Sequence, residues 1–147
     1  MIEGKESITV EYIVLNIADF ELSPDTFVLD NLAELREWRP DVLILRICEN
    51  TQEEKVEAFG AAYLKLIRYF HQDELKIYAV GTFWKHEAKE ACICKAGELP
   101  EVTYVSLEYL HSTAYQAIGQ FEHAGVAAHP SDKGMQAIAD AIFTAMN

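Results

Sequence analysis

One histidine stands where a loop is expected to meet a helix near the end of the chain. In the segment "AGVAAHPSDKGMQAIADAIF" (124–143), His129 directly precedes Pro130, and Ser131 follows as a helix-start residue. Because the residue before a proline is held in an extended conformation, His129 should project from the loop. The positive end of the helix dipole favours its neutral ring, which can accept a proton as a general base. A surface histidine without a chemical role fits the same local sequence.

A second polar group, "CENT" (48–51), follows the most apolar run of the chain. Asn50 carries an amide N–H that could hold an oxyanion at a point where a helix also begins. Thr51 followed by Glu54 has the spacing of a capping box, so Asn50 or Thr51 could equally serve only as a helix cap. The local sequence leaves both interpretations open.

His86, Glu87, Cys92 and Cys94 raise the question of a metal site. A Cys-x-Cys pair with a histidine six residues upstream is not an established zinc spacing, and on the helix expected over 85–96 these side chains point in different directions. We therefore expect no metal and no cofactor. Three cysteines do not make a disulfide framework, so reduced thiols are expected.

The elements that must position these residues alternate along the chain. Strands are predicted at 8–16, 41–47, 75–83 and 102–107, and helices at 26–38, 51–70, 85–96 and 130–146. This alternation is typical of a parallel sheet with helices packed against it. In such sheets, sites form outside the carboxyl ends of the strands. The polar residues expected at that edge are Asn16, Glu49, Asn50, Thr82 and His129.

Composition and charge limit the classes of function. A chain of 147 residues, half of them hydrophobic, predicts one folded domain over 1–147. With 24 acids against 12 bases, the net charge of −12 repels phosphate backbones, so we expect no nucleic-acid partner. No apolar run approaches the ~20 residues of a membrane span. Residues 1–7 lack the basic start and apolar stretch of a secretory signal, so a cytoplasmic location is expected for the chain as given.

Three segments, taken together, resemble one enzyme family. "NIADFE" (16–21), "RPDVLILRICENT" (39–51) and "GVAAHPSDKGMQAIA" (125–139) are similar, in this order, to blocks of the SGNH hydrolases, also called GDSL esterases and lipases. The likeness is to a branch with a "GEN" type third block and a "HPxDKGM" type final block. It implies a flavodoxin-like three-layer α/β/α sandwich that hydrolyses small carboxylic esters, acylated carbohydrates among them, with a serine nucleophile. It assigns His129 as the general base and Asn50 to the oxyanion hole.

The chain also departs from the family pattern. Val126 stands where an aspartate often orients the histidine, and Cys48 stands where a glycine is usual. The family's serine block lies on a strand far ahead of the equivalent of Asn16, and fifteen residues leave no room for it. Ser7, in "GKESIT" (4–9), echoes that block and is the one candidate nucleophile, although no strand precedes it. The resemblance therefore implies an N-terminally truncated domain that is inactive as an isolated chain.

The resemblance also predicts what a missing first strand would do. That strand is central in the family's 2-1-3-4-5 order, so the strand near 10–15 would either pair directly with the one at 42–47 or lie apart from it. The last helix would be nearly alone on one face, and we expect a homo-oligomer that buries this face. Three functions stay open: an inactive SGNH-like domain, a hydrolase completed by a serine from another chain or segment, and a non-catalytic binding or assembly module.

Overall fold

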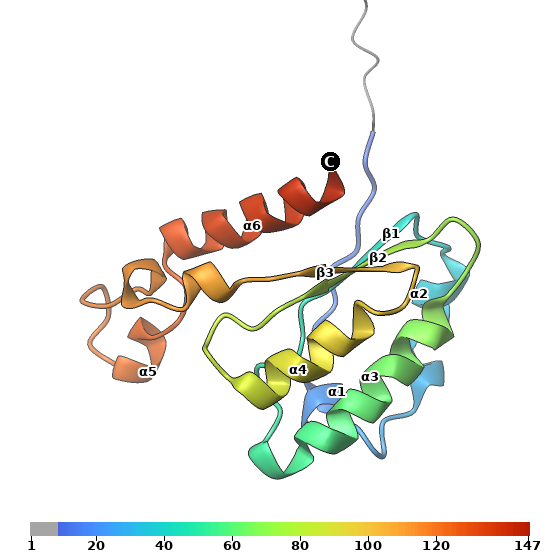
Figure 1. Ribbon diagram of the computed structural model, residues 1–147, viewed down its shortest axis with the longest axis horizontal. Helices are drawn as coiled ribbons and strands as arrows, with labels where there is room; N and C mark the ends of the chain where they lie inside the picture. The colour runs from blue at the N-terminus through green and yellow to red at the C-terminus, as the bar shows by residue number, and fades with distance from the viewer. Residues whose placement is uncertain (1–8) are drawn as a thin grey trace, which may run out of the picture.

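A parallel sheet forms the centre of the structure, a computed structural model that describes residues 9–147 (Figure 1). Within that range the strands β1 (Val42–Leu45), β2 (Lys76–Val80) and β3 (Val102–Val105) stand in the order β1-β2-β3. Both pairs are parallel, with Leu43 of β1 opposite Ile77 of β2. Short, nearly continuous apolar runs suit strands with helices on both faces. The predicted α/β class with a parallel sheet is confirmed.

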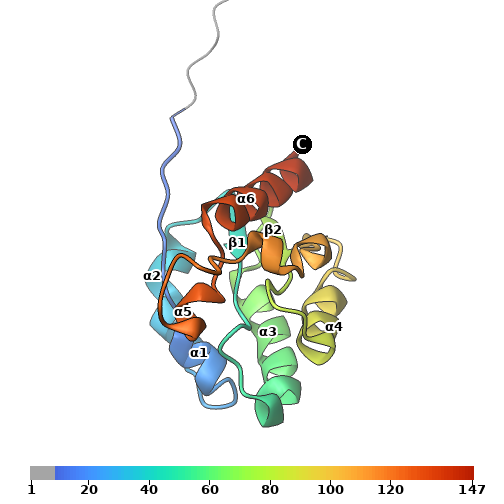
Figure 2. The same cartoon turned by 90° about the vertical axis from the view of Figure 1, so that its left-hand side faces the viewer.

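Helices lie on both faces of the sheet, which gives three layers (Figures 1 and 2). One face carries α3 (Val56–Phe70) and α4 (Glu87–Ala96), together with the short α1 (Ala18–Leu22) and α2 (Ala33–Glu37), whereas α6 (Asp132–Met146) lies on the other. The remaining helical turns are η1 (Leu29–Leu32), η2 (Glu53–Lys55), η3 (Glu108–Leu110), η4 (Thr113–Tyr115) and α5 (Ala124–Ala127).

The larger part of the core lies between the sheet and α3. Apolar residues recur along α3 at helical spacing, so one side of the helix is buried against the strands. A smaller cluster lies under α6, where Ile138 packs with Val80, Val105 and Leu110. Because α6 packs on β3, it leaves the α6 side of β1 open: Val42 and Ile44 there are 41% and 45% exposed.

The strand predicted at 8–16 is wrong for the residues that the structure describes. Residues 9–16 form no strand and pair with none of the strands in 9–147. Their apolar, β-branched composition makes a strand possible, but a strand also needs a neighbour to pair with.

Some predicted element boundaries are also wrong. The helix expected over 26–38 is divided into η1 and α2, and the strand expected over 75–83 ends at Val80. The predicted helix start at Thr51 is displaced as well, because η2 precedes α3 and has Gln52 at its N-cap position without a side-chain cap. Thr51 therefore does not cap the helix.

Candidate functional site

Residues that follow β1 and β2 meet the loop before α6 at the carboxyl edge of the sheet. The Glu49 carboxylate accepts a hydrogen bond from the backbone N–H of Phe83 at 2.6 Å. Next to Phe83, the Trp84 indole donates to the carbonyl of Ala128 at 3.0 Å, and its ring meets the His129 ring edge to face at 5.2 Å. This chain of contacts joins the segment after β1 to His129.

The N–H groups at the end of β1 converge on one carboxylate, that of Glu21 in α1. The backbone N–H groups of Cys48 and Asn50 donate to Glu21 Oε1 at 2.6 and 3.0 Å, and the Asn50 side-chain amide donates to Oε2 at 2.8 Å. Glu21 is only 5% exposed. Three donors around one anionic group make an anion-binding arrangement, and Glu21 occupies it. The Asn50 amide that the family resemblance assigns to an oxyanion hole is therefore engaged within the chain.

Cys48 adopts a backbone conformation that usually belongs to glycine. Its φ of 120° lies in the left-handed region, where a side chain is strained, and this explains why a glycine suits the position. The thiol is fully buried, and burial raises its pKa to about 12. At neutral pH this buried thiol is protonated, so Cys48 cannot replace a missing serine as nucleophile.

His129 is exposed and its ring is oriented by a backbone carbonyl. Its Nδ1 lies 2.8 Å from the carbonyl oxygen of Gly125. A carbonyl can only accept, so Nδ1 carries the proton, and in the neutral ring Nε2 keeps its lone pair. The Gly125 carbonyl thus provides the orienting contact that Val126, in place of an aspartate, cannot make.

The start of α6 fixes the loop that carries His129. Ser131 is the N-cap: its Oγ accepts from the backbone N–H of Gly134 at 3.2 Å and donates to the Tyr115 carbonyl at 3.0 Å. The backbone N–H of Ala117 donates to the His129 carbonyl at 3.0 Å. Ser131, the serine nearest to His129 in sequence, is therefore engaged as a cap and is not free to attack a substrate.

The other sequence candidates have different outcomes. Ser7 lies outside the described residues, so its position relative to His129 is not given. Among residues 9–147 no group of three or more His, Cys, Asp or Glu side chains is placed to hold a metal ion. His86 instead caps α4 through Nδ1 and contacts Glu53 through Nε2 at 2.6 Å. No helix in the described range is long and apolar enough to cross a membrane.

Two further carboxylates at this edge were missed by sequence reasoning or left without a role. The sequence gives Glu21 no role beyond its place in "NIADFE". An acidic residue within a short apolar helix nevertheless indicates a buried polar partner. Glu49 was expected at the edge, and the structure shows that its half-buried carboxylate accepts a hydrogen bond from Phe83 N–H. Burial raises the pKa of Glu49, and the Phe83 hydrogen bond opposes this effect.

Comparisons with known proteins add no relative to this picture: no family model, no curated protein and no solved structure matches the chain. Any functional assignment therefore depends on the motifs and on the geometry of the carboxyl edge.

Proposed function

We propose that this chain forms the base and oxyanion half of an SGNH-type carboxylic ester hydrolase site, and that it carries out no sustained ester turnover alone. The observation that carries the proposal is the orientation of His129. Its Nδ1 proton is held by the Gly125 carbonyl, so in the neutral form of this exposed side chain the lone pair is on Nε2. That tautomer is the one a general base requires.

The arrangement supports a specific division of labour. A serine hydroxyl supplied from elsewhere would attack the ester carbonyl while its proton passes to Nε2 of His129, and the same proton would then go to the leaving alcohol. The negative carbonyl oxygen formed in between needs N–H donors. Those of Cys48 and Asn50 already surround an anion, the carboxylate of Glu21, which would have to withdraw.

A second candidate, a non-catalytic binding or assembly module, is favoured by the same carboxylate. Glu21 is buried and takes all three donors at the end of β1, so the site is filled without any ligand. If Glu21 never withdraws, the fold is retained without the chemistry. The half-site and the non-catalytic module differ in whether the His129 imidazole reacts with an ester.

The assay that separates them uses p-nitrophenyl acetate with wild type, His129→Ala and, as a matched exposed histidine, His123→Ala. We expect slow p-nitrophenol release that is strongly reduced in His129→Ala and retained in His123→Ala, because the Gly125 carbonyl fixes the neutral His129 ring with its Nε2 lone pair available to react. We also expect no labelling of wild type by a fluorophosphonate, which reacts with activated serines.

Each alternative outcome has a defined meaning. Release that is equal in wild type and His129→Ala contradicts the assignment of the base and favours the non-catalytic module. Sustained turnover that requires His129, with the fluorophosphonate found on Ser7 by mass spectrometry, shows a complete enzyme and contradicts the half-site.

A further inference from the structure

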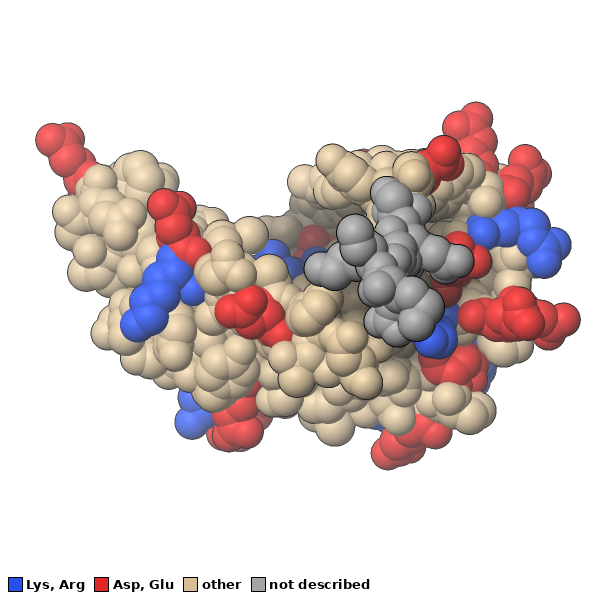
Figure 3. Space-filling model, turned by 90° about the horizontal axis from the view of Figure 1, so that it is seen from above, with Lys and Arg blue, Asp and Glu red and all other residues tan. Residues whose placement is uncertain are grey.

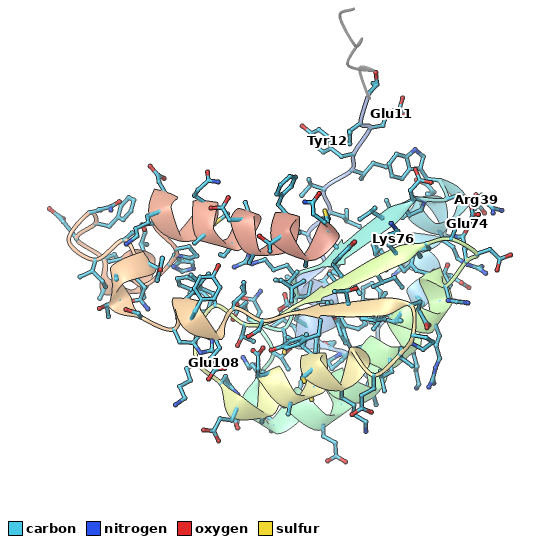
Figure 4. The ribbon with its side chains drawn as sticks, turned by 45° about the horizontal axis from the view of Figure 1, so that its top comes forward. Glu11, Tyr12, Arg39, Glu74, Lys76 and Glu108 are labelled. Carbon is cyan, nitrogen blue, oxygen red and sulfur yellow. The ribbon has the colours of Figure 1, made fainter. Side chains whose placement is uncertain are left out.

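Residues 10–15, here called the arm, form an exposed apolar segment that precedes the folded core. Val10, Tyr12 and Val14 are 74%, 80% and 85% exposed, and Ile13 and Leu15 are more than half exposed. The arm is anchored only where Ile17 and Phe20 enter the core. Figure 4 shows Glu11 and Tyr12 pointing to opposite sides of the arm, as in an extended chain. Apolar residues on both sides are typical of a strand that is covered on both faces.

The outer edge of β1 offers the complementary feature. β1 pairs with β2 along one edge, and no strand within residues 9–147 pairs with the other. On the α6 side of this edge, Val42 and Ile44 are partly exposed, and α6 turns Met135 and Phe143 to solvent at 52% and 69%. Figure 3 shows this side of the molecule, with much uncharged surface and many of the acidic side chains toward its rim. An edge strand beside exposed apolar side chains is a template for another strand.

We propose that two copies of this chain exchange their arms, each arm adding a strand to the free edge of β1 in the other copy. Both complementary surfaces are present on one molecule, so a two-fold arrangement closes with two identical contacts. The arm has six residues and β1 has four, so the arm can pair with the whole strand. Pairing gives hydrogen bonds to the backbone of β1, and the apolar side chains of the arm are buried beside Val42 and Ile44.

A second copy is a better occupant than a charged partner. The arm contains one charged residue, Glu11, and Val42 and Ile44 are uncharged, so the contact would form through backbone and apolar groups. With a net charge of −12 per chain, overall electrostatic repulsion opposes self-association, so apolar and backbone contacts must supply the attraction. The arm and the β1 edge therefore combine an unpaired strand edge with apolar side chains, the two features that can hold two copies together.

Light scattering after size exclusion tests the assembly. We expect wild type to have a mass near twice 16.6 kDa. Val14→Lys and Ile44→Lys should each give monomers, since a lysine would have to be buried in the paired strand. Val28→Lys, at a valine that is 57% exposed and lies outside the arm and β1, should remain a dimer. Circular dichroism should show all three variants folded, and a monomeric wild type would overturn the proposal.

Cysteine cross-linking tests the exchange itself. In a Cys92→Ser, Cys94→Ser background, chains with Val10→Cys, Tyr12→Cys or Val14→Cys are each refolded together with Ile44→Cys chains. We expect a disulfide between the two chains in at least one of these mixtures, and none when Val28→Cys replaces the arm variant. A dimer without such a cross-link uses another surface and overturns the proposal. Val14→Cys and Ile44→Cys are also combined in one chain. A disulfide within a monomer of that chain would place the arm on its own β1 and would also overturn the proposal.

Discussion

The carboxylate of Glu21 takes three N–H donors at the end of β1 that an anion from outside would otherwise use. Only 5% of this residue is exposed, so its charge is stabilised by these hydrogen bonds and not by water. The site and the stability of the fold are therefore coupled at this residue. Removing the Glu21 side chain should free the N–H groups of Cys48 and Asn50 and, at the same time, lower the stability of the fold.

Glu21→Ala should lower the free energy of unfolding by about 1–3 kcal/mol, because the buried N–H of Cys48 and the partly buried N–H groups of Asn50 lose their acceptor. Urea denaturation measures this difference. Asp19→Ala, on the exposed side of the same helix, should change it by less than about 0.5 kcal/mol. Equal stability of Glu21→Ala and wild type would mean that the donors find other partners and that Glu21 does not hold the end of β1.

Glu49 predicts a pH dependence with a definite sign. Burial raises the pKa of this carboxyl above its ordinary value of 4.5, so the folded state holds the proton more tightly than the unfolded state. This stabilising contribution is complete below about pH 4.5 and is lost as pH rises through the folded pKa. Glu49→Gln can still accept from Phe83 N–H and stays neutral. Its melting temperature should therefore match or exceed that of wild type at neutral pH.

The control for this prediction is Glu57→Gln, at an exposed position of α3. Thermal melts of both variants and wild type at acidic and neutral pH give the comparison. Glu49→Gln should remove the part of the decrease in melting temperature from acidic to neutral pH that Glu49 causes. Glu57→Gln should leave this pH dependence as it is in wild type. A Glu49→Gln protein that is clearly less stable than wild type at neutral pH would show that the ionised carboxylate is required.

At the scale of elements, the long periodic segments were predictable and the contacts that complete the site were not. α3 and α6 followed from apolar residues at helical spacing, and β1, β2 and β3 from short apolar runs. The arm has the composition of a strand but is unpaired, because pairing depends on a neighbour that composition does not supply. His129 and Asn50 could be selected from the sequence, because one is an imidazole just before a predicted helix and the other is an amide just after a predicted strand.

The partners of those two residues had no comparable signal. The group that orients His129 is a backbone carbonyl, that of Gly125, and every residue has one. The carboxylate that holds Asn50 comes from a helix 29 residues earlier in the chain, and only the packing of α1 brings it there. Sequence reasoning could therefore find candidate chemical groups but not what each of them touches.

The first turn of α6 fixes the loop of His129 and makes Gly134 sensitive to substitution. A Cβ at this position would lie 2.2 Å from the Tyr115 carbonyl oxygen, a backbone atom that cannot rotate away. Gly134→Ala should therefore cost about 1–3 kcal/mol of unfolding free energy, although alanine is otherwise the better helix former. Thr144→Ala, at an exposed position of the same helix, should not destabilise. A Gly134→Ala protein as stable as wild type would contradict the close approach.

At the scale of the whole molecule, the net charge of −12 acts against the proposed exchange of arms. Two acidic chains repel each other, and salt screens that repulsion without weakening apolar burial. The balance between apolar contact and charge repulsion should therefore depend on ionic strength. Association through oppositely charged groups would show the opposite dependence.

Sedimentation equilibrium should show a tighter dimer as salt is raised from about 0.01 M to about 0.15 M, which shortens the screening length from roughly 30 Å to roughly 8 Å. Val14→Lys should stay monomeric at both concentrations because its defect is in the strand contact. A dimer that dissociates as salt increases would indicate attraction between charges and contradict the apolar interface.

The proposed role of His129 as a base requires that its neutral ring carries the lone pair on Nε2. Nitrogen-15 NMR of the histidine rings in alkaline buffer, where imidazoles are neutral, reports directly which ring nitrogen carries the proton. His111 is an internal reference, because its Nε2 lies 2.9 Å from the Thr82 carbonyl and must carry the proton. The predicted result is a proton on Nδ1 of His129 and on Nε2 of His111. A proton on Nε2 of His129 would contradict the proposed base.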